Sequence, residues 1–83
     1  MNRWVPWRSL GERLRAARAR TGLFQRDVAF RLGVQRGMYG QYELGIARPS
    51  RERLAAMATM LDLDLTELLI LAGYEPPRRT YDR

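Results

Sequence analysis

The chain has 83 residues, a formal net charge of +6 and neither cysteine nor histidine. This length allows one small domain, and the two missing residue types exclude disulfides, thiol nucleophiles and imidazole acid–base chemistry, so we expect no metal site, no cofactor and no enzyme. No apolar run reaches the roughly 18 residues of a membrane span, and residues 1–8 lack the apolar segment of a signal peptide, which predicts a cytoplasmic protein.

The first predicted helix follows an irregular N-terminal arm, residues 1–8, in which no periodicity is visible. The helix is expected to open with a capping box, in which Ser9 and Glu12 accept hydrogen bonds from free backbone N–H groups, and to end at Gly22. Its inward stripe is predicted from spacings of four, three and four residues: Leu10, Leu14, Ala17 and Thr21.

Two short helices are predicted next, one over 25–32 and one over 35–43, joined by a tight turn at Gly33. The small side chain of Ala29 leaves room for the second helix to cross the first closely, and glycine is the natural residue for a left-handed turn. This arrangement is typical of a helix-turn-helix, whose second helix usually enters the DNA major groove.

A connector that contains Pro49 separates these helices from a fourth, predicted over 51–61 with Ser50 as its cap. The fourth helix is expected to bury four apolar side chains: Leu54, Met57, Ala58 and Leu61. A second capping box, Asp64 with Glu67, then opens a fifth helix that ends at Gly73.

The sequence therefore predicts an all-α fold, a compact bundle of five helices without strands. The domain is expected to span residues 9–73, and residues 74–83 are expected to form a polar C-terminal tail.

Charge is distributed unevenly along the chain. All 15 basic residues are arginines, and residues 1–53 carry a net charge of +8 whereas residues 54–75 carry −4. GC-rich coding explains arginine in place of lysine equally well, but it does not explain the distribution. A basic pole and an acidic pole are expected of a protein that docks one face on a polyanion.

From Leu10 to about Gly73 the chain resembles the phage-repressor, Cro-like family of helix-turn-helix proteins, also called the xenobiotic-response-element type. Ten pieces carry the resemblance in order: Arg18, Gly22-Leu23, Gln25, Ala29, Gly33-Val34, Gln41-Tyr42-Glu43, Gly45, Arg48-Pro49-Ser50, Leu63-Asp64-Leu65 and Glu67-Leu68-Leu69. The resemblance implies a lambda-repressor-like fold. It also implies a nucleoid-associated, DNA-binding transcriptional regulator, a repressor that binds a palindromic operator as a dimer.

The resemblance implies which side chains meet the bases. Arg36, Gly37 and Gln41 match positions on the exposed face of the recognition helix, where side chains reach base edges. Arg36 is suited to O6 and N7 of guanine and Gln41 to N6 and N7 of adenine. The alternative is that both are solvated residues of a surface helix.

The same resemblance implies phosphate contacts and a structural ion pair. Gln25 matches the residue at the amino end of the second helix that meets a phosphate, and Arg48 and Arg51 match phosphate contacts further along the chain. Arg18 and Glu43 match a salt bridge that ties the first helix to the end of the recognition helix. We assign this pair to structure, and we expect both Tyr39 and Tyr42 in the core.

The fifth helix is apolar on more than one face. Leu65, Leu68 and Leu69 are expected to fill the core, while Ile70 and Leu71 are expected to face the other side. A monomer would leave those two exposed, so we predict a homodimer through this region, with recognition helices about 34 Å apart.

Several residues depart from the family pattern. Phe24 stands where a serine, threonine or asparagine usually caps the second helix. Gly37 and Gly40 lie inside the recognition helix, where each costs about 1 kcal/mol relative to alanine. They indicate either a very close approach to another surface or weakened reading of DNA.

Three aromatic residues, Trp4, Trp7 and Phe30, are not required by the family core. Either the arm folds back so that a tryptophan covers Phe24 or Phe30, or the three form a surface for a protein partner. The second possibility supports an alternative function, an adaptor or inhibitor on a helix-turn-helix scaffold, including the antitoxin of a toxin–antitoxin pair.

Overall fold

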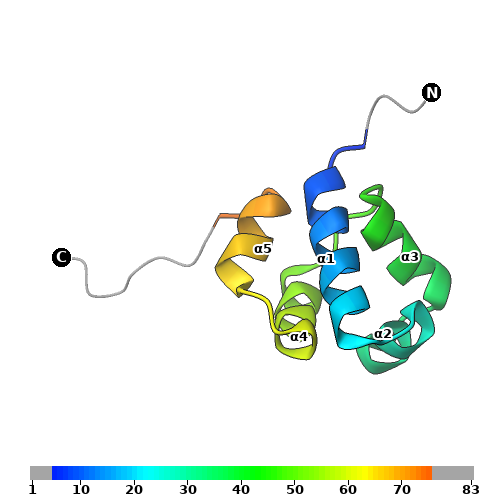
Figure 1. The fold of residues 1–83 in the computed structure, drawn as a ribbon. Helices are drawn as coiled ribbons and strands as arrows, with labels where there is room; N and C mark the ends of the chain where they lie inside the picture. The colour runs from blue at the N-terminus through cyan, green and yellow to red at the C-terminus, as the bar shows by residue number, and fades with distance from the viewer. Residues whose placement is uncertain (1–4, 76–83) are drawn as a thin grey trace.

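The computed structural model describes residues 5–75, which fold into five helices without a strand (Figure 1). The helices are α1 (Arg8–Thr21), α2 (Gln25–Leu32), α3 (Arg36–Leu44), α4 (Arg51–Leu61) and α5 (Leu65–Leu71). In Figure 1, α1 runs through the middle, with α2 and α3 on one side and α4 and α5 on the other. The predicted all-α bundle is confirmed. None of the described helices has the length and apolar character needed to cross a membrane.

All five helices contribute to one apolar core. The side chains with no exposed surface include Leu10, Leu14, Ala17, Val28, Tyr39, Leu54, Met57, Leu61 and Leu68. Tyr42 is 2% exposed and meets Tyr39 edge to face, with 6.4 Å between ring centroids, so both tyrosines are core residues as predicted. Thr21 is exposed, which makes its predicted place in the inward stripe wrong. Its hydroxyl instead donates to the carbonyl of Arg18 at the end of α1.

The capping box predicted at Ser9 and Glu12 is wrong, because α1 begins earlier, at Arg8, with Trp7 as its N-cap. The Trp7 N–H donates to the carbonyl of Gly45 at 3.0 Å, and the Trp7 carbonyl accepts from the N–H of Gly11 at 3.0 Å. The end of α3 therefore fixes the residue before α1, and the local capping signal is overridden.

Gly11 allows α1 and α3 to touch backbone to backbone. A Cβ atom at this position would overlap the carbonyl group of Glu43, lying 2.7 Å from its carbon, which no ordinary contact permits. The residue is buried where α1 crosses the last turn of α3. Glycine at position 11 therefore sets the distance between the two helices.

The turn between α2 and α3 has the predicted form. Gly33 adopts a left-handed φ of 76°, and the N–H of Val34 donates to the carbonyl of Ala29 at 3.0 Å. Phe24 offers no side-chain acceptor, but its own N–H donates to the Asp27 carboxylate at 2.8 Å, which completes half of a capping box. α2 has the predicted bounds, and α3 begins one residue later than expected.

The caps of α4 and α5 agree with the sequence in part. The Ser50 hydroxyl accepts from the backbone N–H of Arg53 at 3.1 Å, and all four core residues expected in α4 are buried. The Asp64 carboxylate accepts from the N–H of Thr66 at 3.1 Å. Glu67 does not close the second capping box. It pairs instead with Arg13 of α1, with 3.1 Å between Nε and the carboxylate.

Candidate nucleic-acid interface

One face of α3 is buried and the opposite face is open. Tyr39 and Tyr42 point into the core, whereas Arg36, Gly37 and Gln41 are exposed. A Cβ atom at Gly37 would meet nothing within 4 Å, so no described residue covers this face. The three residues predicted to reach base edges therefore lie together on a free helical surface.

The two glycines inside α3 are not required by packing within the described chain. A Cβ atom at Gly40 would lie 3.7 Å from the side-chain oxygen of Gln25, which is an ordinary van der Waals contact. The position of Gly37 is open space. Of the two explanations considered for these glycines, a close approach within the monomer is therefore not observed.

Arg18 and Glu43 form the expected ion pair between α1 and α3. The Nε and Nη2 atoms of Arg18 donate to the two carboxylate oxygens, and Nη1 donates to the carbonyl of Leu23. The side chain of Glu43 is only 4% exposed and that of Arg18 is 17% exposed. Burial alone would raise the pKa of Glu43, but the hydrogen bonds and the opposite charge of its partners, led by Arg18, together outweigh burial and hold the pKa below its usual value.

Gln25 belongs to the same network. It is the first residue of α2 and is half-buried, and its amide Nε2 donates to the Glu43 carboxylate at 2.9 Å. The ion pair therefore also orients the residue predicted to meet a phosphate, and the amide oxygen is left beside Gly40.

Among the described residues, the Tyr39 hydroxyl is the buried side-chain atom without a hydrogen-bond partner, and burial raises its pKa.

Arg48 and Arg51, the other predicted phosphate contacts, both lie against the ring of Tyr74. The guanidinium carbon of Arg48 lies 4.1 Å from the centre of the Tyr74 ring, and that of Arg51 lies 4.7 Å away. Arg48 Nη1 also donates to the carbonyl of Ala72 at 3.3 Å. Both arginines are exposed. The sequence interpretation does not identify Tyr74, because it places this residue in a polar tail.

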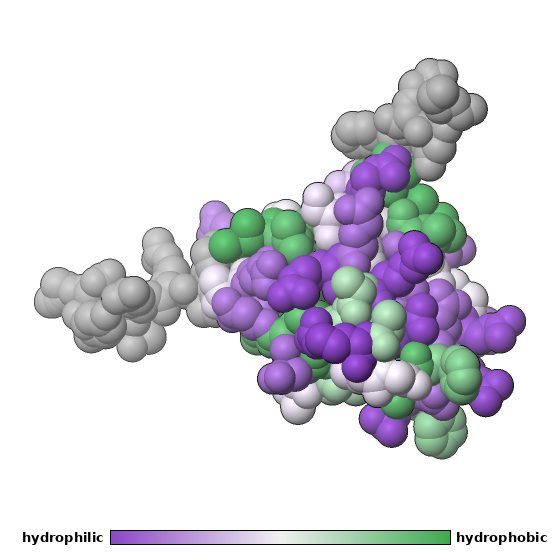
Figure 2. Space-filling model, in the orientation of Figure 1, coloured by the Kyte–Doolittle hydropathy of each residue, from purple (hydrophilic) through white to green (hydrophobic). Residues whose placement is uncertain are grey.

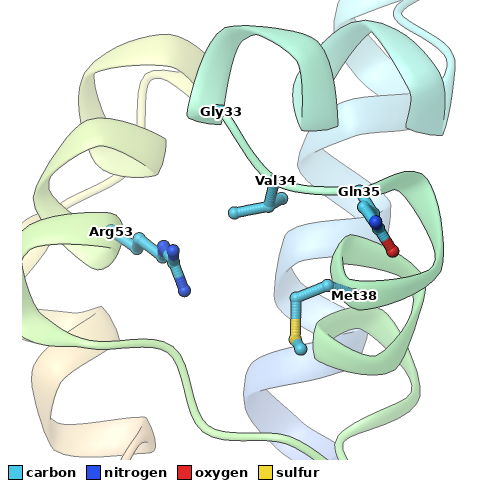
Figure 3. Close-up of a pocket in the computed structure, with 5 residues that line it drawn as sticks. All are labelled: Gly33, Val34, Gln35, Met38 and Arg53. Carbon is cyan, nitrogen blue, oxygen red and sulfur yellow. The ribbon is translucent and has the colours of Figure 1, made fainter.

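Arg53 of α4 is a further cation that the sequence interpretation does not single out. It lines an open hollow beside the helix-turn-helix turn together with Gly33, Val34, Gln35 and Met38, and its side chain extends from α4 into this hollow (Figure 3). Its Nη1 donates to the Tyr42 hydroxyl at 3.1 Å. One more arginine therefore lies next to the recognition helix.

The region predicted as the dimer interface is only partly as expected. Ile70 is 57% exposed, whereas Leu71 is half-buried and packs against the core, so only part of its side chain faces outward. Leu71 is the last residue of α5. Apolar surface is visible at the α5 end of the molecule and near the start of α1 in Figure 2.

Of the three aromatic residues, the two that the structure describes, Trp7 and Phe30, differ in burial. Trp7 packs against the core and its ring lies 6.0 Å from the guanidinium of Arg48, so it covers neither phenylalanine. Phe30 is 86% exposed, and Phe24 is 61% exposed beneath the guanidinium of Arg26. Trp4 lies outside the described residues.

Comparisons with known proteins identify relatives of this chain. The helix-turn-helix domain family matches residues 9–69. The SPbeta prophage-derived uncharacterized HTH-type transcriptional regulator YonR of Bacillus subtilis is 37% identical over 59 residues, or 71% of this chain and 55% of the relative. The transcriptional regulator ClgR of Mycobacterium tuberculosis is 37% identical over 70 residues, or 84% of this chain and 62% of the relative. The chain thus spans less than two thirds of the length of these relatives.

Solved structures with the same fold extend the comparison. The restriction-modification controller protein C.AhdI from Aeromonas hydrophila superimposes with a TM-score of 0.69 and 34% identity, over 78% of this chain and 98% of the controller. The clp gene regulator ClgR from Corynebacterium glutamicum gives a TM-score of 0.71 and 29% identity, over 87% of this chain and 77% of that protein. With α2 and α3 packed around the Gly33 turn and the sequence match over most of its length, the chain belongs to the phage-repressor-like helix-turn-helix family.

Proposed function

We propose that this chain is a sequence-specific DNA-binding transcriptional regulator, a repressor that acts by occupying an operator in the nucleoid of the cytoplasm. The observation that carries the proposal is the open face of α3, on which Arg36, Gly37 and Gln41 are exposed while the opposite face is anchored in the core. A protruding helix of nine residues fits the width of the major groove. The names of its relatives, which are transcriptional regulators, support the same function.

In this proposal the exposed polar side chains divide into two groups. Arg36 and Gln41 read guanine and adenine edges, and each good pair contributes about 1–3 kcal/mol of discrimination. Gln25, Arg48 and Arg51 meet phosphates and fix the position of α3 without reading sequence. Gly37 leaves a flat strip between the reading residues, which lets a base pair approach the backbone of α3.

The regulator would bind as a homodimer on a palindromic operator. Ile70 of α5 is exposed although it is a large aliphatic side chain, and a second copy of the chain is its natural cover. Two-fold symmetry would place the recognition helices about 34 Å apart, one turn of DNA. Leu71 would contribute through its partly exposed surface.

Random-site selection with the purified chain tests the function directly. We expect an enriched, two-fold symmetric duplex whose preference is lost when Arg36 or Gln41 is replaced by alanine. Binding should also weaken as salt is raised, because phosphate contacts release counterions. Weak binding without sequence preference would contradict the proposal.

One observation favours a second function, an adaptor or inhibitor that binds a protein, as an antitoxin does. Phe30 is 86% exposed on the outer side of α2, where the core of the described chain does not cover it. A Phe30→Ser variant separates the two. It should leave operator binding unchanged and abolish protein capture if the adaptor function is correct.

A further inference from the structure

We propose that Tyr74 is a positioning residue for DNA binding, which holds Arg48 and Arg51 against its ring for the phosphates that flank the recognition helix. The inference rests on the proposed function and adds to it a residue outside the helix-turn-helix itself. It assigns a part in DNA binding to the turn that follows α5.

Tyr74 is fixed at both ends, so its ring is a rigid platform. Its backbone N–H donates to the carbonyl of Leu69 at 2.9 Å, and its hydroxyl donates to the carbonyl of Pro49 at 2.9 Å. The second bond ties the turn after α5 to the connection between α3 and α4, in which Arg48 lies. The ring therefore occupies one place relative to both arginines.

Two guanidinium groups share this one ring. Their central carbons lie 4.1 Å and 4.7 Å from the ring centre, for Arg48 and Arg51 respectively. Two neighbouring cations repel each other, and the negative face of an aromatic ring offsets that repulsion. Within residues 5–75 neither guanidinium forms a salt bridge with a carboxylate. The pair is thus a site of double positive charge, which an anion complements.

Stacking leaves the hydrogen-bond donors of both groups available. A guanidinium stacks through its flat face, whereas its five N–H bonds point outward in the plane of the group. Arg48 uses one nitrogen, Nη1, for the carbonyl of Ala72, and its remaining donors are free within the described residues. Arginine side chains lose considerable rotamer freedom when they bind, so prior ordering on a ring favours phosphate contact.

The location of the pair fits a phosphate of the DNA backbone. Arg48 lies in the segment that directly follows α3, and Arg51 is the first residue of α4. Both are exposed, and the proposed base-reading face belongs to the helix that immediately precedes them. When α3 lies in the major groove, the segment leaving its end meets the adjoining strand, which carries the phosphates.

The test measures duplex binding by fluorescence anisotropy at several salt concentrations, using the duplex selected by the wild-type chain. Tyr74→Met keeps the apolar bulk but lacks the aromatic face, and Tyr74→Phe keeps the face but loses the bond to Pro49. We expect Tyr74→Met to give a shallower dependence of log K on log salt, by about 0.9 for each phosphate that the arginines no longer neutralise. Tyr74→Phe should retain the wild-type slope, because the backbone bond to Leu69 still holds the aromatic ring beside both arginines.

The double variant Arg48→Ala with Arg51→Ala tests whether Tyr74 acts on the salt dependence through these two arginines. Adding Tyr74→Met to it should change the slope no further. An unchanged slope in Tyr74→Met with a lowered melting temperature would overturn the proposal and leave Tyr74 a structural residue. If Tyr74→Met does not fold, Tyr74→Leu replaces it, with circular dichroism as the check on folding.

Failure of the proposed function gives a different result from failure of this inference. If selection returns no preferred duplex, the regulator assignment is contradicted, while the slopes can still be compared on an arbitrary duplex, since phosphate contacts do not depend on sequence. If a preferred duplex is found and the Tyr74→Met slope equals that of the wild type, only the role of Tyr74 is overturned.

Discussion

Arg18 and Glu43 lie 25 residues apart in sequence and join α1 to α3 through two hydrogen-bonded nitrogens. Because the Glu43 carboxylate also accepts from Gln25, one nearly buried charge holds the beginning of α2 and both crossing helices. The pair therefore connects the stability of the fold with the geometry of the proposed DNA-binding surface.

Glu43→Gln should destabilise the protein. The amide cannot balance the charge of Arg18, whose side chain is only 17% exposed. We expect a loss of about 2 kcal/mol, below the ~3–5 kcal/mol of a fully buried pair because Arg18 still reaches water. Urea unfolding at pH 7 measures it. Glu67→Gln is the matched control: it breaks the more exposed pair with Arg13 and should cost less than about 1 kcal/mol. Equal losses in the two variants would contradict the assignment.

The same carboxylate makes stability depend on pH in acid. The pKa of Glu43 is lowered in the folded protein, so the native state binds its proton more weakly than the unfolded chain does. The stabilisation is fully present above the ordinary pKa of about 4.5 and is lost as the pH falls through the folded value. The free energy of unfolding should therefore decrease more steeply from pH 7 to pH 3 for the wild type than for Glu43→Gln. Parallel curves would be inconsistent with this role.

Gly11→Ala should be strongly destabilising, since its Cβ atom would lie 2.7 Å from the carbonyl carbon of Glu43, which is backbone and cannot swing aside. Overpacking of this kind costs about 1–3 kcal/mol or more. Thermal unfolding provides the measurement. Gly37→Ala is the control at an open position in α3, where alanine should stabilise the helix by up to about 1 kcal/mol. A Gly11→Ala variant as stable as the wild type would show that the helices can separate without cost.

Arg36→Ala and Arg51→Ala should affect DNA binding differently. Loss of Arg36 should lower affinity for the selected operator by roughly 5- to 150-fold, the equivalent of about 1–3 kcal/mol, and relax the preference at one base pair. Loss of Arg51 should weaken all duplexes to a similar degree and make the salt dependence shallower. Competition binding against operators mutated one base pair at a time distinguishes the two. If Arg36→Ala lowered the affinity for all operators equally, Arg36 would not read a base.

Ile70→Glu should prevent self-association without unfolding the chain, because the side chain is 57% exposed in the monomer. A buried glutamate facing its own copy across a two-fold axis would be strongly unfavourable. Sedimentation velocity at micromolar concentration should show the wild type as a dimer and the variant as a monomer. Phe30→Glu serves as a control on an exposed apolar residue of another helix. A dimer that survives Ile70→Glu would place the interface elsewhere.

The sequence predicted the number and order of the helices well, because their signals are local. Glycines at helix ends, Ser50 and Asp64 as caps, and apolar residues at helical spacing all act within a few residues. The ion pair of Arg18 with Glu43 came from the family resemblance, and no local pattern indicates it. The predicted bounds of α2 and α4 agree with the structure at both ends.

The errors and omissions arose where distant segments meet. Gly11 has no distinctive neighbours in sequence, and its importance is visible only once Glu43 lies against it. Tyr74 looked like part of a polar tail because its partners belong to another loop. Leu71 packs partly against the core, and this contact with other helices is not visible in the spacing of α5 alone.

The hydrogen bond from the N–H of Trp7 to the carbonyl of Gly45 makes the start of α1 depend on the end of α3. Gly45 is doubly constrained: its φ of 80° disfavours other residues, and any Cβ would lie 2.6 Å from the Trp7 carbonyl oxygen. The first turn of α1 therefore keeps this position only while the end of the recognition helix is folded against it. In a synthetic fragment ending before α2, helix initiation should revert to Ser9, where the local sequence would have placed it.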